Sequence, residues 1–353
     1  MVLLSSALSL ASFSLSAAAL AINASLSLGT NISAVAPSKF KLVHKHQGND
    51  FLDERCMRVS PLRSPAHPLS SKWSYFTGAD PTNGKVQYLS KADAVSNKLA
   101  TVQSDGTVEF NVQQGDLPRG QNRKSVRIGS VQPWSKGLII ADFKAMPYGC
   151  GVWPAFWTVG PNWPNGGELD IIEGINTRHF NQLTLHSGEG SNCTVDTNPG
   201  LVNGVPPFLA QPGNLDCRST PDANTGCGFI DDDPNAYGSG FNSVDGRVFA
   251  VLRDDRGILI WSFQRSAVPA DIVAGAPDPN LWSSPRAYFS SQTCDIDEHV
   301  QPQTIVLNTD VMGDFAQSGL QDSGCSTDVA GVVADGTNYA NATWIVNYIS
   351  LWE

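Results

Sequence analysis

The chain has 353 residues, with 23 Lys and Arg against 33 Asp and Glu, so its formal net charge is -10. This acidic balance argues against a nucleic-acid partner, which would require a basic face to bind phosphate. Hydrophobic residues make up 41% of the chain and aromatic residues 9%, which excludes a largely disordered protein and supplies apolar material for a sizeable core.

The N-terminal segment is free of charged side chains up to Lys39. Residues 1–21 are predicted to be a secretory signal peptide that ends in small residues suited to cleavage. An uncleaved signal anchor is the alternative, but the lysines that follow would then lie outside, against the positive-inside tendency. Residues 22–37 are interpreted as a flexible, Ser- and Ala-rich lead-in, and no other stretch is long and apolar enough to span a bilayer.

Sequons and cysteines fit an exported protein. Asn-x-Ser/Thr sequons begin at Asn23, Asn31, Asn192 and Asn341. The seven cysteines form no Cys-x-x-Cys pair, which indicates disulfides rather than structural zinc. The odd count leaves at least one cysteine free or paired between chains, and the connectivity does not follow from sequence. A local disulfide is expected in the loop-like stretch that holds Cys193, Cys217 and Cys227.

From residue 38 to residue 353 the chain shows no linker and no repeat, which predicts one domain. Short β-branched and aromatic runs recur between turn signals, without long helical periodicity. The predicted strands lie within Gly106–Val112, Ser125–Val131, Gly137–Ala145, Arg247–Phe263, Thr304–Asn308 and Ala342–Trp352. Within Arg247–Phe263, the segment Asp254–Gly257 separates two apolar runs, which predicts a hairpin. This pattern predicts an all-β protein, an antiparallel sandwich or barrel.

Three carboxylates, Glu168, Asp170 and Glu173, interrupt an otherwise apolar run that is bounded by glycines. Because ionised carboxylates are costly to bury and repel one another, a purely structural strand has little reason to carry three. A strand that presents an acid/base pair to a sugar does have a reason to carry several carboxylates. The alternative interpretation is an exposed acidic strand that is solvated or binds a cation.

The geometry of a β-strand determines the direction in which each of these carboxylate side chains points. Residues two apart share a face, so Glu168 and Asp170 point the same way, whereas Glu173 would face the core by strict alternation. A β-bulge around Ile171–Ile172 would return Glu173 to the carboxylate face, and bulges are common beside active sites. The three side chains are therefore predicted to converge on one concave face.

Three tryptophans, Trp153, Trp157 and Trp163, lie just upstream of the carboxylates. Indole faces are natural platforms for the apolar faces of sugar rings, although at least one of the three is expected to pack in the core. Two further acidic runs, Asp231–Asp233 and Asp295–Glu298, are interpreted as solvated loop acids rather than calcium sites. Fingerprints for a P-loop, a dinucleotide site or a nucleophilic serine are absent from the sequence.

The segment Trp-Pro-Ala-Phe-Trp followed by Gly-Glu-Leu-Asp-Ile-Ile-Glu-Gly resembles the signature of glycoside hydrolase family 16, particularly laminarinase-like fungal endo-β-1,3(4)-glucanases. The resemblance covers most of residues 38–353, including Trp73–Gln87, Asn122–Ile128, Asn181–Ser187, Tyr237–Asn242, Ala267–Ile272 and the C-terminal strand. It implies a family 16 catalytic domain over residues 38–353, a β-jelly-roll sandwich with a concave cleft, and hydrolysis of internal β-1,3 or mixed β-1,3/1,4-glucan bonds. The alternatives are a glucan transglycosylase and a non-catalytic glucan-binding lectin on the same fold.

By position, the resemblance implies that Glu168 is the nucleophile, Glu173 the general acid/base and Asp170 the auxiliary carboxylate that tunes the pair. Two carboxyls about 5–5.5 Å apart favour a retaining double displacement. The substrate-binding residues implied are Trp157, Trp163, Gln182, His186, Arg127 and Phe315. From the residues alone, a satisfied core histidine is the preferred interpretation of His186, and a strand salt bridge explains Arg127 equally well.

The sequence departs from the family pattern at Met312–Gln317, where many relatives have Cys-Gly-Asp-Trp-Ala-Gly. Phe315 therefore replaces a tryptophan of the cleft wall. The missing cysteine is expected to leave a disulfide partner unpaired, with Cys325 as the candidate, and Cys56 could have taken over the lost pairing. The resemblance further implies a monomer without cofactor or metal that acts on β-glucan, binds neither nucleic acid nor membrane after signal cleavage, and is secreted, either free or associated with the cell wall.

Overall fold

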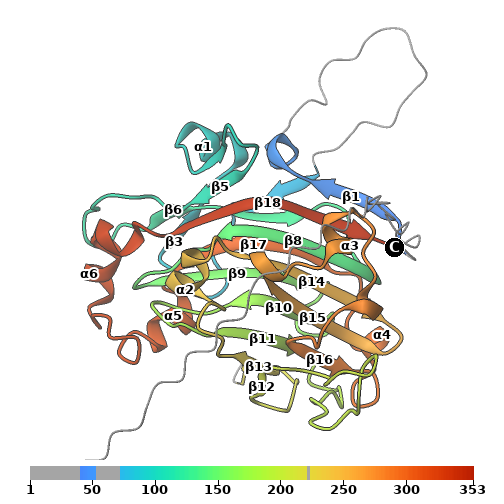
Figure 1. Ribbon diagram of the computed structural model, residues 1–353. Helices are drawn as coiled ribbons and strands as arrows, with labels where there is room; N and C mark the ends of the chain where they lie inside the picture. The colour runs from blue at the N-terminus through green and yellow to red at the C-terminus, as the bar shows by residue number, and fades with distance from the viewer. Residues whose placement is uncertain (1–39, 53–71, 221–222) are drawn as a thin grey trace, which may run out of the picture. The chain divides into compact units, whose positions relative to one another are not determined.

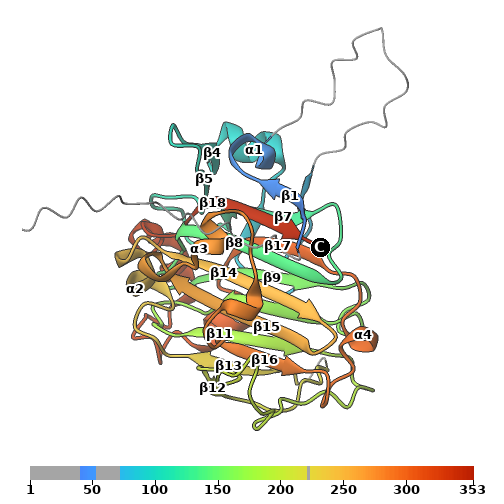
Figure 2. The same cartoon turned by 45° about the vertical axis from the view of Figure 1, so that its right-hand side comes forward.

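A computed structural model describes residues 40–52, 72–220 and 223–353. The predicted signal peptide and lead-in, the first two sequons and Cys56 all lie outside the described residues. Two antiparallel sheets dominate the fold (Figures 1 and 2). The sheet that carries the carboxylate run, here called the motif sheet, consists in spatial order of β12 (Gln211–Pro212), β13 (Cys227–Asp231), β11 (Asn181–His186), β10 (Glu168–Glu173), β9 (Val152–Val159), β17 (Thr304–Val311), β7 (Arg127–Ser130) and β2 (Trp73–Tyr75).

The second sheet, here called the opposite sheet, is built around the last strand of the chain. Its spatial order is β16 (Ala287–Ser290), β15 (Gly257–Gln264), β14 (Arg247–Asp254), β8 (Gly137–Ala145), β18 (Thr343–Trp352), β5 (Val108–Asn111) and β4 (Ala100–Val102), and β1 (Leu42–His46) also pairs with β18. The strands β14 and β15 form the predicted hairpin, with Asp254 opposite Gly257. All the predicted strand segments contain strands, and the prediction of an antiparallel sandwich is confirmed.

Helices are short and lie in the connections between strands. They are α1 (Lys91–Ser96), α2 (Gly238–Ser243), α3 (Ala270–Val273), α4 (Ile296–His299), α5 (Gly313–Ser318) and α6 (Val329–Ala334), with single 3-10 turns η1 (Gly48–Phe51), η2 (Arg265–Ala267), η3 (Pro279–Leu281) and η4 (Gly336–Tyr339). A small parallel pair joins β3 (Val86–Tyr88) to β6 (Arg123–Ser125). None of the helices described here is long and apolar enough to cross a bilayer.

The main core lies between the two sheets, because alternate residues of each strand point inward. Phe143 of β8 packs against Phe156 of β9, with ring centroids 5.0 Å apart, and against Trp344 of β18 at 5.2 Å. Leu169 and Ile171 of β10 join the same apolar cluster. Each fully buried side chain of this size contributes roughly 1.5–3 kcal/mol relative to exposure, so the core fixes which face of β10 points away from it.

Three disulfides join cysteines of the described residues: Cys150–Cys325, Cys193–Cys294 and Cys217–Cys227. The expected local disulfide is confirmed as Cys217–Cys227. The expectation that Cys325 lacks a partner is wrong, because the fold brings its Cα within 5.6 Å of that of Cys150 across 175 residues. A contact of such sequence separation depends on the sheet topology and leaves no local signal.

The interpretation of both acidic runs as solvated loop acids is wrong for the first of them. Asp231 is only 2% exposed and lies 3.3 Å from Arg286, and Asp233 pairs with both Arg286 and Arg247. The guanidinium groups of these arginines therefore balance the carboxylate charges, which a calcium ion would balance in a metal site. In the second run, Asp297 pairs with Lys136 at 2.8 Å.

Candidate active site

A cleft of about 770 Å³ lies over the face of the motif sheet that points away from the core. Strand alternation places Trp153, Ala155, Trp157 and Val159 of β9 on this face, and the ladder sets Trp157 opposite Asp170 of β10. The other residues around the cleft come from four more strands, three loops and helix α5. They are Asp80, Pro81, Thr82, Arg127, Trp163, Glu168, Glu173, Gln182, His186, Thr220, Asn224, Thr225, Asn308, Asp310, Asp314 and Phe315.

The predicted bulge is present in β10. The register against β9 shifts between Asp170 and Ile172, so that Ile171 is the extra residue. Both isoleucines are fully buried in the core, and Glu173 lies in the cleft with Glu168 and Asp170. The convergence of the three carboxyls on one face is therefore confirmed, because the bulge resets the alternation that would have turned Glu173 inward.

Burial dominates the electrostatics of the three carboxyls. It raises the pKa of Glu168, of Asp170 and of Glu173 to about 8 in each case, because the charged form loses its hydration. The charge of Asp170 raises the pKa of both glutamates further. Close carboxyls of this kind cannot all ionise together at neutral pH, so the cluster retains protons that one member can donate.

Glu173 is held at both its backbone and its carboxyl. Its Oε1 accepts a hydrogen bond from the Nε1–H of Trp153 at 3.1 Å, and its backbone N–H donates to Oδ1 of Asn181 at 2.9 Å. The positive charge of Arg178 acts in the same direction as the Trp153 hydrogen bond and lowers the pKa of Glu173, which partly offsets burial. The carboxyl is thus fixed in direction while it keeps its proton.

The β10–β11 ladder sets His186 opposite Glu168. Asp170 lies two residues further along β10 on the same face, and the imidazole of His186 contacts its carboxyl. Its Nε2 is 3.3 Å from Oδ2 of Asp170, and its Nδ1 is 2.8 Å from Oγ of Ser219. His186 is only 6% exposed, yet it borders the cleft. It is therefore a largely buried residue at the wall of the cleft. The interaction with His186 lowers the pKa of Glu168 and of Glu173, which partly offsets the effect of burial on both.

The aromatic residues lie along the cleft rather than in the core. Trp163 is 40% exposed, and Trp153 packs edge-on against Phe315 with ring centroids 5.5 Å apart. Trp157 donates its Nε1–H to Oδ1 of Asn308 at 2.7 Å. The expectation that one of the three tryptophans belongs to the core is wrong, because Trp153 and Trp157 have the same strand parity and Trp163 follows the end of β9.

Arg127 and Gln182 also border the cleft, from strands on either side of the carboxylates. The guanidinium of Arg127 lies 4.9 Å from the ring centroid of Phe76 and 5.0 Å from that of Trp157, which holds it by cation–π contacts rather than by an ion pair within the described residues. Oε1 of Gln182 accepts from Arg178 at 3.2 Å. Both positions implied by the resemblance therefore lie where a substrate could reach them.

Several polar residues of the cleft were not predicted. Oγ1 of Thr82 lies 2.6 Å from Oδ2 of Asp80 and 3.0 Å from Oδ2 of Asp310, and burial raises the pKa of Asp310 to about 8. Asn308 and Asp310 lie two residues apart in β17 and so share one face of the strand, which could have identified them as cleft residues. Asn181 and Ser219, which contact cleft residues from buried positions, gave no such signal.

The same centre could ligate a metal ion, since one ligand atom each of Glu168, Asp170 and His186 lie within 4.8 Å of one another. An ion bound there would take up the lone pairs that acid/base chemistry needs. The sequence prediction of no metal stays a prediction.

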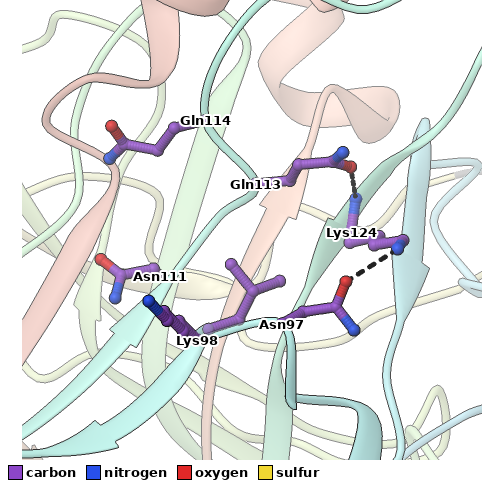
Figure 3. Close-up of a pocket in the computed structure, with 7 residues that line it drawn as sticks. Asn97, Lys98, Asn111, Gln113, Gln114 and Lys124 are labelled. Atoms are coloured by element: carbon purple, nitrogen blue, oxygen red, sulfur yellow. Dashed lines mark hydrogen bonds between the residues drawn. The ribbon is translucent and has the colours of Figure 1, made fainter. Parts of the chain in front are cut away.

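A second pocket, of about 400 Å³, lies away from these carboxyls (Figure 3). It is bordered by Leu99 and by amide and lysine side chains: Asn97, Lys98, Asn111, Gln113, Gln114 and Lys124. Lys124 donates to Oδ1 of Asn97 at 2.9 Å, as Figure 3 shows. None of the residues that line this pocket carries a carboxyl group, so it lacks the carboxyl pair that glycosidic bond cleavage needs, and the cleft is the candidate active site.

Comparison with known proteins agrees with this geometry. A family model for XgeA-like catalytic domains of glycoside hydrolase family 16 matches residues 73–352. A probable glycosidase of Schizosaccharomyces pombe is 36% identical over 78% of this chain and 64% of its own length. An endo-1,3(4)-β-glucanase of Arthroderma benhamiae is 35% identical over 80% of this chain and 62% of its own length. The chain thus spans somewhat less than two thirds of these curated relatives.

Two solved structures match nearly the whole described fold. An elongating family 16 β-1,3-glucosyltransferase is 33% identical, with a TM-score of 0.76, and covers 89% of this chain and 100% of its own. Laminarinase 16A of Phanerochaete chrysosporium is 31% identical, with a TM-score of 0.75, over 89% of this chain and 99% of its own. The match of the family model, the shared two-sheet fold and the carboxyl cluster lead to one conclusion: the chain belongs to glycoside hydrolase family 16.

Proposed function

We propose that the protein is a retaining glycoside hydrolase that cleaves internal β-1,3 or mixed β-1,3/1,4 bonds of β-glucan. The observation that carries this proposal is the placement of Glu168 and Glu173 on one face of a bulged strand, at the base of a cleft bordered by tryptophans. Glu168 acts as the nucleophile and Glu173 as the general acid/base. A lectin would need the aromatic residues and amides but not a crowded group of buried carboxyls.

The reaction takes place in two steps. In the first, Glu173 donates its proton to the glycosidic oxygen, Glu168 attacks the anomeric carbon, and the aglycone leaves as an alcohol. In the second, Glu173 takes a proton from water, the resulting hydroxide attacks the same carbon, and Glu168 is released as a carboxylate. The raised pKa of Glu173 supplies the proton of the first step near neutral pH.

Asp170 and His186 adjust the charge of the pair. Asp170 lies between the two glutamates in β10, and its charge raises their pKa. His186 contacts Asp170 and Ser219, and its interaction with the two glutamates lowers the pKa of both.

The relatives and the cleft both support this substrate class. The Arthroderma relative is named an endo-1,3(4)-β-glucanase, and the laminarinase structure holds 6-O-glucosyl-laminaritriose in both donor and acceptor sites. Trp153, Trp157 and Trp163 offer indole faces along the cleft that suit stacked glucose rings. We expect several consecutive glucose units to bind along these faces.

The test is incubation of the purified protein with laminarin, lichenan and cellulose. Short oligosaccharides from laminarin or lichenan, released early with the β-anomer in excess by NMR, are expected for a retaining endo-enzyme. Early excess of the α-anomer would contradict the double displacement, and binding of all three polymers without turnover would favour the lectin.

A transglycosylase is the second candidate, favoured by the similarity to the elongating glucosyltransferase. In that enzyme class a sugar hydroxyl replaces water in the second step. Incubation with laminari-oligosaccharides distinguishes the two, because a transglycosylase forms products longer than its substrate while a hydrolase forms only shorter ones.

We further propose that the protein is secreted as a monomer, either into the medium or to the cell wall, after cleavage of residues 1–21. The three disulfides of the described residues support an oxidising compartment. N-terminal sequencing of protein from the culture medium tests the cleavage, and retention of an intact N-terminus in a membrane fraction would favour the anchor instead.

A further inference from the structure

We propose that Asn181 is a positioning residue whose carboxamide holds the bulge of β10 and thereby aims Glu173 into the cleft. This inference rests on the proposed function, in which Glu173 is the general acid/base. Asn181 is the first residue of β11, is fully buried and does not border the cleft.

At the bulge, part of β10 is not paired with the neighbouring strand β11. On the side of β11 the ladder pairs residues 168 to 170 of β10 and stops there. On the side of β9 it resumes at Ile172 and Glu173 after the register shift. Backbone groups that face β11 at the bulge therefore need another partner, because buried peptide groups are seldom left unpaired.

The carboxamide of Asn181 supplies that partner. Its Oδ1 accepts the backbone N–H of Glu173 at 2.9 Å, and its Nδ2 donates to the carbonyl of Ile171 at 3.0 Å. A carboxamide offers one acceptor and one donor side by side, as a peptide group of a neighbouring strand would. The side chain thus continues the sheet across the two residues where the backbone of β11 does not.

The strand that carries the carboxamide of Asn181 is held firmly by its neighbours. Asn181 pairs with Asp231 of β13 in the strand ladder, and Asp231 is held by Arg286 at 3.3 Å. The side chain is closed to solvent, so its two hydrogen bonds form without competition from bulk water. Asn181 therefore fixes the backbone of Glu173, just as Trp153 fixes its carboxyl at 3.1 Å.

Loss of this support should affect proton donation more than substrate binding. Without it, the segment from Ile171 to Glu173 can relax toward regular alternation, which turns Glu173 away from the glycosidic oxygen. The expected signature is a lower kcat with little change in KM, and dependence of the loss on how much the leaving group needs a proton.

The experiment compares Asn181→Ala with wild type in the full chain on two substrates. Laminaripentaose needs protonation of its leaving group, whereas 2,4-dinitrophenyl β-laminaribioside does not. We expect kcat/KM to fall by about 10²-fold on the oligosaccharide and by less than about 5-fold on the aryl glycoside, since general acid catalysis contributes about 10²–10⁴-fold. Equal losses on both substrates would overturn the positioning role.

A matched control is Asn176, which is equally buried and makes the same two kinds of bond elsewhere. Its Oδ1 accepts from the N–H of Gly151 at 2.7 Å and its Nδ2 donates to the carbonyl of Ala316 at 2.9 Å. Asn176→Ala is expected to change kcat/KM by the same factor on both substrates. A leaving-group dependence in this variant as large as that of Asn181→Ala would overturn the assignment to Asn181.

If Asn181→Ala does not fold, Asn181→Asp serves the same purpose. A protonated Asp reproduces the acceptor and donor of Asn, whereas an ionised one cannot donate to Ile171. The ratio of variant to wild-type activity on the oligosaccharide should therefore rise as the pH falls, and a constant ratio would contradict the proposal. A wild-type protein inactive on both substrates would instead overturn the proposed function itself.

Discussion

Glu168, Asp170 and Glu173 lie in a buried site where the charge of Asp170 makes both glutamates harder to ionise. Burial and repulsion act in the same direction on Glu173, while the hydrogen bond from Trp153 and the charge of Arg178 act against them. The proton affinity of the acid is thus set by groups that can be changed one at a time, which makes the site testable residue by residue.

Replacement of either glutamate should abolish turnover of β-glucan. Glu168→Gln removes the nucleophile, and Glu173→Gln removes the proton donor, so each is expected to lower kcat on laminarin by at least about 10²–10⁴-fold. Reducing-end assays on purified variants with unchanged thermal melting would measure this. Near-wild-type turnover in either variant would contradict the assigned roles.

Asp170→Asn should move the alkaline limb of the pH–activity profile to lower pH. The charge of Asp170 raises the pKa of Glu173, so its removal lets Glu173 lose its proton at lower pH. The measurement is kcat/KM on laminarin between pH 4 and pH 9. Asp255→Asn is the control, because Asp255 is almost fully exposed in its ion pair with Lys136, and its profile should not shift.

Trp153→Phe should move the same limb in the opposite direction. The Nε1–H of Trp153 stabilises the ionised form of Glu173 by a 3.1 Å hydrogen bond, and phenylalanine keeps an aromatic ring beside Phe315 but cannot donate. The pKa of Glu173 should therefore rise. A profile of Trp153→Phe that shifts to lower pH would show that the hydrogen bond does not control the acid.

At the scale of single elements, β10 shows how far the sequence is informative. Alternation along one strand is a local property, so the apolar face, the carboxylate face and the need for a bulge could be predicted from residues 168–173 alone. What holds the bulge could not be predicted, because Asn181 acquires its role only through the pairing of β11 with β10 and β13.

The Cys217–Cys227 disulfide closes the segment that brings Ser219 to His186. Replacing both cysteines by alanine should lower the free energy of unfolding by about 2–3 kcal/mol, as expected for a loop of about ten residues. Because the contact of His186 with Ser219 then loosens, KM for laminarin should also rise. Calorimetry and steady-state kinetics check the two effects, and an unchanged melting temperature would show that the loop is held by other contacts.

At the scale of the whole molecule, the buried carboxyls should make stability depend on pH. Their pKa values are raised above those of the unfolded chain, so between about pH 4 and pH 8 the native state binds more protons. Stability should therefore fall as the pH rises through this window. Glu173→Gln should stabilise the protein at pH 8 by about 1–2 kcal/mol and hardly at pH 4, as measured by urea unfolding.

The sequence predicted the class of fold and the composition of the active strand, but not the arrangement of strands. The pairing of Cys150 with Cys325, and the burial of Asp231 beside Arg286, both arise where segments distant in sequence meet. A local sequence pattern does not indicate which distant segments will contact each other in the fold. The family resemblance supplied part of this information for the cleft, where it indicated His186 and Gln182, but it misled for Cys325.

The position of β18 has a consequence for biosynthesis. This strand lies between β8 and β5 and also pairs with β1, yet it comes last of the described strands along the chain. The edges of β5 and β8 therefore stay open while the ribosome makes everything from Ala145 to Thr343. Open strand edges invite pairing with other chains, so the nascent protein is exposed to misassembly until its final strand closes the sheet.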